Sequence, residues 1–219
     1  TINLAMTLAG NTVIDVGAGQ LILGGVITDG SNTYGLLKEG SGLLALRGAN
    51  SFDAGLVINS GTVGSARNSG SNTNLGSAAV TVNQGGTLRL GHSVTSNTNS
   101  STTPNDVILA GGSLFADDAF QHLTGTLNVT VGGSLGSTYN AGTNSTGERD
   151  KGLFLDGIVT GSGNLNLLQT RISTGSNYNT SIVHFNNNAN TYSGEITIIP
   201  MSGTAGGSYL GIGAPNALK

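Results

Sequence analysis

The sequence predicts an all-β fold in which parallel strands coil into a β-helix, a solenoid that carries polar loop insertions. Three observations predict it: short apolar alternations, corners rich in glycine and asparagine, and an internal repeat. We expect residues 1–219 to form a single continuous segment of this solenoid.

Strands are expected where apolar residues recur at every second position between clusters of Gly, Asn and Ser. In chain order these alternations are Ile14–Val16, Leu21–Leu23, Leu44–Leu46, Val80–Val82, Leu88–Leu90, Val107–Leu109, Leu127–Val131, Leu153–Leu155, Leu165–Leu167, Ile196–Ile198 and Leu210–Ile212. No stretch shows the spacing of an amphipathic helix. With only 3 prolines in the chain, the backbone ladders can run uninterrupted, because proline removes a ladder donor.

The connections between these runs favour parallel over antiparallel pairing. Tight hairpins usually carry Asn-Gly or Asp-Gly, and only Asp29-Gly30 and Asp156-Gly157 have that form. The corners carry Gly-Gly and Gly-Ser-Gly instead, which tolerate positive φ. With rungs of about 20–24 residues, we expect roughly 9–11 rungs and a rod of about 45–50 Å.

An internal repeat relates the first part of the chain to the last. Leu21–Ile27 matches Leu153–Val159, Gly40–Gly42 matches Gly161–Gly163, and Ala49–Phe52 matches Ala189–Tyr192, in the same order. Strands of similar sequence can stack on one another in successive turns of a solenoid. We interpret the chain as about one and a half copies of a unit of about 130–140 residues, over 12–150 and 151–219, cut from a longer protein or fibre.

Four polar stretches separate the apolar runs, at 67–74, 92–106, 137–150 and 173–180. Their Ser, Thr, Asn and Gly content offers little to bury, so we expect loops that project from the solenoid.

The composition excludes several classes of function. Charged residues make up 9% of the chain and the net charge is −3, too weak for electrostatic binding to nucleic acid or to an anionic membrane. The absence of cysteine removes disulfides and thiolate metal sites. No apolar run approaches the 18 residues of a spanning helix, so membrane insertion of this segment is not expected.

The stretch from Gly35 to Phe52 resembles the autotransporter-associated β-strand repeat. The matching positions are Lys38, Gly40, Gly42, Leu44, Leu46, Gly48, Asn50 and Phe52, followed by Gly61-Thr62-Val63. The resemblance is specific over residues 21–90 and partial over 150–219. It implies a right-handed parallel β-helix in the exported passenger region of a bacterial surface protein, located outside the cell on the outer surface.

The resemblance also implies architectural roles for single residues. Gly40 and Gly42 would shape a corner, Leu44 and Leu46 would point into the coil, Phe52 and Tyr192 would pack at equivalent corners, and Asn50 and Asn190 would bond turn backbone.

Polysaccharide hydrolases and lyases of the β-helix type are an enzymatic alternative. Galacturonan hydrolases of that fold use Asn-Thr-Asp, Asp-Asp, Gly-His-Gly and Arg-Ile-Lys in that order. This chain has Gly91-His92-Ser93, then Asp117-Asp118, then Arg171-Ile172-Ser173. The order differs and the lysine is missing, so Asp117-Asp118 is interpreted as a polar turn rather than as the carboxylate pair of glycoside hydrolysis.

Other site types find less support. His92, His122 and His184 show no metal-ligand spacing, and we expect no carboxylate partner near them. Asp15, Asp29 and Asp156 are expected at solvated corners, and no phosphate-binding loop occurs. We therefore predict no catalytic, cofactor-binding or metal-ligating residues and no cofactor.

The leading functional hypothesis is a non-enzymatic extracellular structural segment, a rigid stalk or fibre that displays or spaces other modules. An adhesin that binds glycans or a host surface through its loops is the alternative; Tyr34, Tyr139 and Tyr178 lie in candidate loops but stand alone. The expected partners are further copies of the repeat, within one polypeptide or head to tail, with a glycan or cell-surface partner in the adhesin case and no nucleic acid.

The last expectation concerns how the two ends of the chain pack. An apolar alternation is already under way at Ile2-Asn3-Leu4, and Asn216–Lys219 falls within a repeat. We expect both ends to stack on further rungs, since an open strand edge recruits another strand, and Leu4→Lys to suppress that association.

Overall fold

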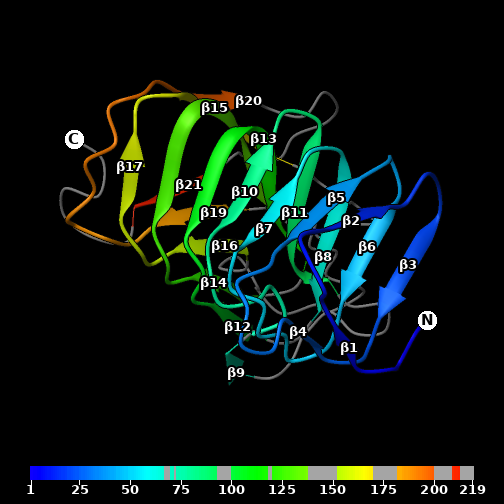
Figure 1. Ribbon diagram of the computed structural model, residues 1–219. Helices are drawn as coiled ribbons and strands as arrows, with labels where there is room; N and C mark the ends of the chain where they lie inside the picture. The colour runs from blue at the N-terminus through cyan, green and yellow to red at the C-terminus, as the bar shows by residue number, and fades with distance from the viewer. Residues whose placement is uncertain are drawn as a thin grey trace, which may run out of the picture.

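The computed structural model describes residues 1–66, 70–71, 73–92, 100–117, 120–137, 152–169, 182–199 and 209–212, and every regular element in them is a strand. Each pairing between these strands is parallel (Figure 1). The prediction of an all-β chain of parallel strands is confirmed. None of the described residues form a helix long and apolar enough to cross a membrane.

The strands follow one another in eight layers, each pairing in register with the layers before and after it. Layer 1 holds β2 (Thr12–Asp15), β3 (Gln20–Leu23) and β4 (Ile27–Thr28), and β4 also pairs with β1 (Met6–Thr7). Layer 2 holds β5 (Leu36–Glu39) and β6 (Leu43–Leu46); layer 3 holds β7 (Leu56–Ile58), β8 (Gly61–Ala66) and β9 (Gly70–Ser71). Layer 4 holds β10 (Val80–Asn83), β11 (Gly86–His92) and β12 (Ser100–Thr103); layer 5 holds β13 (Val107–Ala116) and β14 (Phe120–Leu123). Layer 6 holds β15 (Leu127–Ser137) and β16 (Gly152–Leu155); layer 7 holds β17 (Val159–Gly161), β18 (Asn164–Gln169) and β19 (Ile182–Phe185); layer 8 holds β20 (Ile196–Ile199) and β21 (Tyr209–Ile212).

The largest sheet is strongly curled, because two long strands belong to both of its arms. The first part of β13 pairs with β10, and its second part pairs with β11. The bend falls at Gly111 and Gly112, where Gly111 has φ +96°. In the same way β15 pairs with β17 before its bend and with β18 after it. A six-stranded sheet, from β9 to β21, forms a further side.

The core is built from columns of in-register apolar side chains. One column runs through all eight layers: Leu21, Leu44, Val63, Leu88, Leu114, Leu135, Leu167 and Ile198. From Leu44 to Leu167 these side chains are at most 2% exposed. Burying one such side chain stabilises the fold by about 1.5–3 kcal/mol, so the column is a main source of cohesion between layers. Leu44 and Leu46 are both fully buried, as the resemblance implies.

Glycines occupy the corner between the two arms of the curled sheet because neighbouring layers approach too closely for a side chain. Gly40 has φ +73° and Gly61 has φ +66°. A Cβ atom on Gly61 would lie 2.3 Å from the carbonyl oxygen of Gly40 in the layer below. A corner is expected at Gly40 and Gly42. There the backbones of neighbouring layers are in direct contact, without side chains between them.

Two expectations about the layers need correction. The distance in sequence between register partners is 20 residues from Leu36 to Leu56 and 32 from Leu127 to Val159, a wider range than the expected 20–24. Insertions such as 138–151, between β15 and β16, account for the longer layers. The described residues therefore make fewer layers than the expected 9–11.

Two of the stretches expected to be loops also contain strands. Gly70–Ser71 forms β9 and Ser100–Thr103 forms β12, and Asn74 is fully buried. In β12 the buried side chains are Ser101 and Thr103, and β9 consists of Gly and Ser, so hydrophobic alternation did not reveal these strands. The other two expected loops, 137–150 and 173–180, lie outside the described residues apart from Ser137, which ends β15.

Candidate functional site

Two polar clusters, each centred on an aspartate, lie at the ends of strands. In the first, Asp117 directly follows β13, and His92 and Arg89 lie on β11 in the layer below. Arg89 Nε donates to Asp117 Oδ1 at 2.8 Å, and His92 Nδ1 lies 2.7 Å from Asp117 Oδ2. The carboxylate is 6% exposed and the imidazole 13% exposed, so this is a largely buried ion-pair cluster.

The site is shaped around the His92 ring. A Cβ atom on Gly64 of β8 would lie 2.7 Å from His92 Cδ2, so only glycine leaves room for the imidazole. The carboxylate accepts a hydrogen bond from a protonated Nδ1, and in the neutral ring of that tautomer Nε2 is the acceptor. Nε2 is buried and has no hydrogen-bond partner among the described residues. Chemically, the cluster holds the imidazole in one orientation with its Nε2 atom buried.

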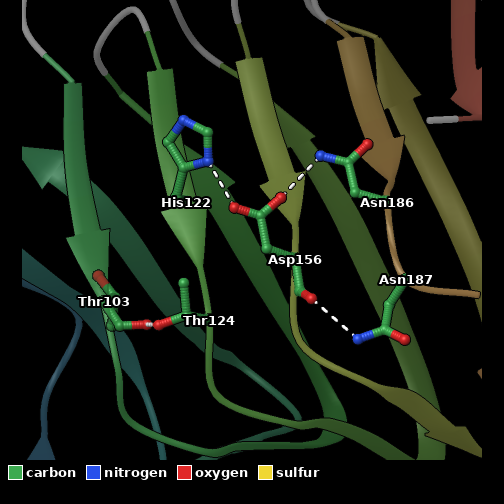
Figure 2. Close-up of polar contacts among 6 residues, drawn as sticks. All are labelled: Thr103, His122, Thr124, Asp156, Asn186 and Asn187. Atoms are coloured by element: carbon green, nitrogen blue, oxygen red, sulfur yellow. Dashed lines mark hydrogen bonds and ion pairs between the residues drawn. The ribbon is translucent and has the colours of Figure 1, made fainter. Parts of the chain in front are cut away.

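The second cluster is more open and links three consecutive layers (Figure 2). Asp156, which directly follows β16, lies between His122 on β14 and Asn186 just after β19. His122 Nδ1 is 2.6 Å from Asp156 Oδ2, and Asn186 Nδ2 donates to Asp156 Oδ1 at 2.7 Å. The amide of Asn187 donates to the backbone oxygen of Asp156 at 3.0 Å. The side chains of His122 and Asp156 are 29% and 31% exposed.

A short stack of rings continues from this cluster along the outward side of the six-stranded sheet. His122, Phe154 and His184 are register partners in successive layers. The ring centroids are 4.7 Å apart for His122 and Phe154, and 4.2 Å apart for Phe154 and His184, with near-parallel planes. Both faces of Phe154 are therefore covered, and the stack ends at the level of Gly211.

The histidine expectation is wrong in one respect: both His92 and His122 have carboxylate partners. Because register partners in a layered fold are many residues apart in sequence, His92 and Asp117 are separated by 25 positions, and His122 and Asp156 by 34. No spacing rule for contiguous motifs could have found them. Among the described residues no group of three or more metal-ligating side chains comes together.

The structure brings together only part of the hydrolase-like pieces. Gly91-His92 meets Asp117, although the two lie in the opposite order to that of galacturonan hydrolases. Ser93, Asp118 and Arg171–Ser173 lie outside the described residues. Both Asp117 oxygens are engaged by Arg89 and His92, so within this cluster the carboxylate holds the imidazole in position.

Lys38 is an unexpected member of the interior. It is fully buried, and its ammonium group donates to the carbonyl oxygens of Glu39, Gly40 and Ser60 at 2.5, 2.7 and 3.2 Å. Burial lowers the pKa of Lys38, and the nearby carboxylates partly oppose that shift. Three carbonyls from two layers satisfy its three N–H groups, so its role here is to hold a corner together.

Of the three aspartates expected at solvated corners, Asp15 is exposed but Asp29 is 2% exposed. Asp29 Oδ2 accepts hydrogen bonds from the backbone amides of Tyr34 at 3.1 Å and Asp53 at 3.2 Å. The Tyr34 amide is the main reason that the pKa of Asp29 is lowered. The pKa of Asp53 is raised, mainly by burial and secondly by the neighbouring Asp29.

The asparagines of the repeat make the same bond twice, across layers rather than within their own turns. Asn50 Oδ1 accepts from the backbone amide of Ile27, and Asn190 Oδ1 from that of Val159, both at 2.7 Å. Both asparagines are 4% exposed. The expected bond to backbone is confirmed, but its partner is a strand residue of the preceding layer.

The residues considered for glycan binding do not form a platform within the described structure. Tyr34 packs against the core. Tyr139 and Tyr178 lie outside the described residues.

Comparisons with known family models, curated proteins and solved structures find no match. The stacking of the strands and the contacts between layers are therefore the basis for the functional proposal.

Proposed function

We propose that this chain is a segment of a right-handed parallel β-helix with a structural, non-enzymatic role as a stiff stalk or fibre outside a bacterial cell. The observation that carries the proposal is the unbroken column from Leu21 to Ile198, one apolar side chain per layer. Right-handedness follows from the strong preference of parallel crossover connections.

The polar clusters support the same role. The carboxylates of Asp117 and Asp156 and the ammonium of Lys38 each bridge neighbouring layers. Their donors and acceptors are used within the stack, as expected for groups that hold a scaffold together. The resemblance to the autotransporter-associated repeat supports a location on the bacterial surface, with Gly40, Leu44 and Leu46 in the positions that it implies.

Engineered cysteine pairs test the stacked architecture without background, because the chain has no cysteine. Thr81 and Ile108 are register partners in adjacent layers, at a Cα separation of about 4.8 Å that a disulfide can span. The Thr81→Cys/Ile108→Cys variant should cross-link rapidly under mild oxidation. Thr81→Cys/Asn128→Cys, two layers apart at about 10 Å, is the control and should not. Equal cross-linking of both pairs, or helical far-UV circular dichroism, would contradict the fold.

A polysaccharide hydrolase or lyase is the second candidate, favoured by the meeting of His92 with Asp117 at 2.7 Å. It predicts release of reducing or unsaturated ends from polygalacturonate, lost in His92→Ala and retained in the matched variant His122→Ala. Absence of turnover by the unmodified chain on polyuronides removes this candidate.

A further inference from the structure

The chain turns three corners in each of layers 4 to 6, and two of them are short in every layer. The first arm of the curled sheet holds β10 and the first part of β13, and the second arm holds β11 and the second part of β13. The glycine corner between the arms takes two residues in layer 4, and β13 and β15 run through it without a break. The return corner, from the six-stranded sheet to the first arm of the next layer, always takes three residues: 104–106, 124–126 and 156–158.

The third corner, from the second arm to the six-stranded sheet, varies in length, and we call it the insertion corner. It takes seven residues in layer 4 (93–99), three in layer 5 (117–119) and fourteen in layer 6 (138–151). The strands that follow it, β12, β14 and β16, nevertheless pair residue by residue without a shift. The extra residues therefore change the separation of these strands in sequence but not their pairing.

Backbone contacts close the glycine corner in layer 5. Gly111 has φ +96°, and a Cβ atom on Gly112 would lie 2.6 Å from the carbonyl oxygen of Asn83 in layer 4. A Cβ atom on Gly133 in layer 6 would lie 2.4 Å from the carbonyl oxygen of Gly112. The backbone is thus in close contact with both neighbouring layers, so an extra residue here would force the layers apart.

Hydrogen bonds between layers close the return corner. The backbone N–H of Val107 donates to the carbonyl oxygen of Thr126 at 2.8 Å. Asn105, which is 5% exposed, donates from Nδ2 to the carbonyl oxygen of Ala78 at 2.7 Å. A Cβ atom on Gly125 would lie 2.2 Å from the carbonyl oxygen of Asn105. Extra residues would separate these buried polar groups from their partners, which costs stability.

Side-chain contacts hold the strands on both sides of the insertion corner. Where the second arm ends, Asp117 bonds Arg89 and His92 of the layer below. Where the six-stranded sheet begins, the ring of Phe120 lies 5.9 Å from that of Phe154 in the next layer, measured between centroids. These contacts join layer to layer, so they do not depend on the length of the connection between the two strands.

We propose that the insertion corner is the edge on which this scaffold carries additional chain, and that the glycine and return corners are closed to it. The inference rests on the proposed scaffold role and assigns display to one edge along the stack. The free energy of closing a flexible loop grows slowly with its length, so an anchored corner can accept more residues while the stack stays intact. A partner would then meet segments from successive layers side by side along this edge.

One flexible segment inserted at three places in layer 5 tests the proposal. A Gly/Ser-rich segment of about ten residues, which includes the recognition sequence of a site-specific protease, would follow Asp118, Gly111 or Gly125. The Asp118 and Gly125 sites are closely matched, because each lies in a three-residue connection next to β14. We expect the urea midpoint to stay close to that of the unmodified chain for the Asp118 insertion. It should fall by about 1 M or more for the other two, or the chain should not fold.

Cleavage by the protease under native conditions measures whether the inserted segment is displayed. The Asp118 insertion should be cut at least about tenfold faster than the Gly125 insertion if the latter folds, whereas both should be cut equally fast in urea. After cleavage the two fragments of the Asp118 variant should elute together in size-exclusion chromatography, since the strands on both sides of the cut remain paired with β15 and β16.

Equal midpoints and equal cleavage for the three insertions would overturn the assignment of display to one edge. Unfolding of the Asp118 variant, or a lower midpoint for it than for the Gly125 variant, would also overturn it. In either case cross-linking of Thr81→Cys/Ile108→Cys would still support the scaffold role. Failure of that cross-link in a chain without insertions would contradict the scaffold role itself.

Discussion

At the scale of single residues, burial separates two otherwise similar His–Asp pairs. Asp117 is 6% exposed and holds both Arg89 and His92, whereas Asp156 is 31% exposed. Water screens the second pair and can replace its partners, but it cannot do so for the first.

Asp117→Asn should therefore cost more stability than Asp156→Asn. We expect a loss of about 1.5–3 kcal/mol for Asp117→Asn, because Arg89 and His92 lose their charged acceptor. Asp156→Asn should cost no more than about 1 kcal/mol. Urea unfolding monitored by circular dichroism measures both, and equal losses would show that burial does not distinguish the pairs.

Lys38→Met tests the buried ammonium at the glycine corner. Methionine fills a similar volume but removes three hydrogen bonds to carbonyl oxygens, so the free energy of unfolding should fall by about 1–3 kcal/mol at neutral pH. Arg47→Met, which removes a cation from a less buried position, is the control and should change it by less than about 0.5 kcal/mol.

The same lysine gives a pH dependence of known sign. Because its pKa is lowered on folding, the unfolded chain binds more protons between that value and 10.5. The Lys38 contribution to the free energy of unfolding therefore rises with pH across that window. Thermal melts measure this effect. The change in Tm from pH 7 to pH 10 should be less positive, or more negative, for Lys38→Met than for the unmodified chain.

Within the Asp29–Asp53 pair, Asp53 gives an opposite dependence at lower pH. The raised pKa of Asp53 means that its contribution is present below pH 3.8 and is lost as the pH rises through the raised value. Asp29, with its lowered pKa, contributes above pH 3.8 and loses that contribution only in stronger acid. Asp53→Asn keeps a donor for Asp29 and removes the second charge, so it should raise the Tm at neutral pH. Glu195→Gln at an exposed position is the control, and an equal rise there would contradict this account.

At the scale of elements, the sequence predicts the apolar strands and the glycine corners well. Leu21–Leu23, Leu44–Leu46 and Leu153–Leu155 all lie in strands, because alternation records which side of a strand is buried. Apolar alternation does not reveal β12, whose buried residues are Ser101 and Thr103. It also does not predict the length of β13 and β15, because both strands continue through glycines. Cross-layer partners such as His92 and Asp117 depend on register, which is set by insertion lengths that no local pattern encodes.

The two copies of the repeat show the same limit. Leu56–Ile58 forms β7, which pairs with β5 and β10 in one arm of the curled sheet. Ile196–Ile198, which the repeat aligns with Leu56–Ile58, lies in β20, which pairs with β18 in the other arm. The hydrogen bonds of Asn50 and Asn190 are nevertheless the same. The two copies of the repeat therefore share a local contact between layers, although the strands that follow lie in different arms of the sheet.

Corner glycines allow a test that separates two effects. Gly61→Ala introduces both an unfavourable positive φ and a Cβ atom 2.3 Å from the Gly40 carbonyl oxygen. Gly30→Ala introduces a positive φ of +69° with nothing within 4 Å, so it should cost only about 1–2 kcal/mol. We expect Gly61→Ala to cost clearly more in chemical unfolding; similar costs would show that the layers can separate at the corner.

At the scale of the whole molecule, stability should be highest in the middle of the stack, since interior layers are covered on both sides and end layers on one. Leu88→Ala and Leu21→Ala are the same substitution in the same column. The first should cost about 2–5 kcal/mol and the second less than half as much. Amide hydrogen exchange should give the strongest protection in β11 and β13 and the weakest in β2 and β20; uniform protection would indicate all-or-none opening.

The parallel register also determines how the molecule should respond to mechanical force. A pull on the two termini loads the end layers first, and each layer can peel away while the rest of the stack stays intact. The released contour length then depends on the layer. The 20 residues between Leu36 and Leu56 correspond to about 70 Å, and the 32 between Leu127 and Val159 to about 110 Å. A stretched molecule should therefore lengthen in unequal steps, with the longest steps coming from the layers that carry insertions.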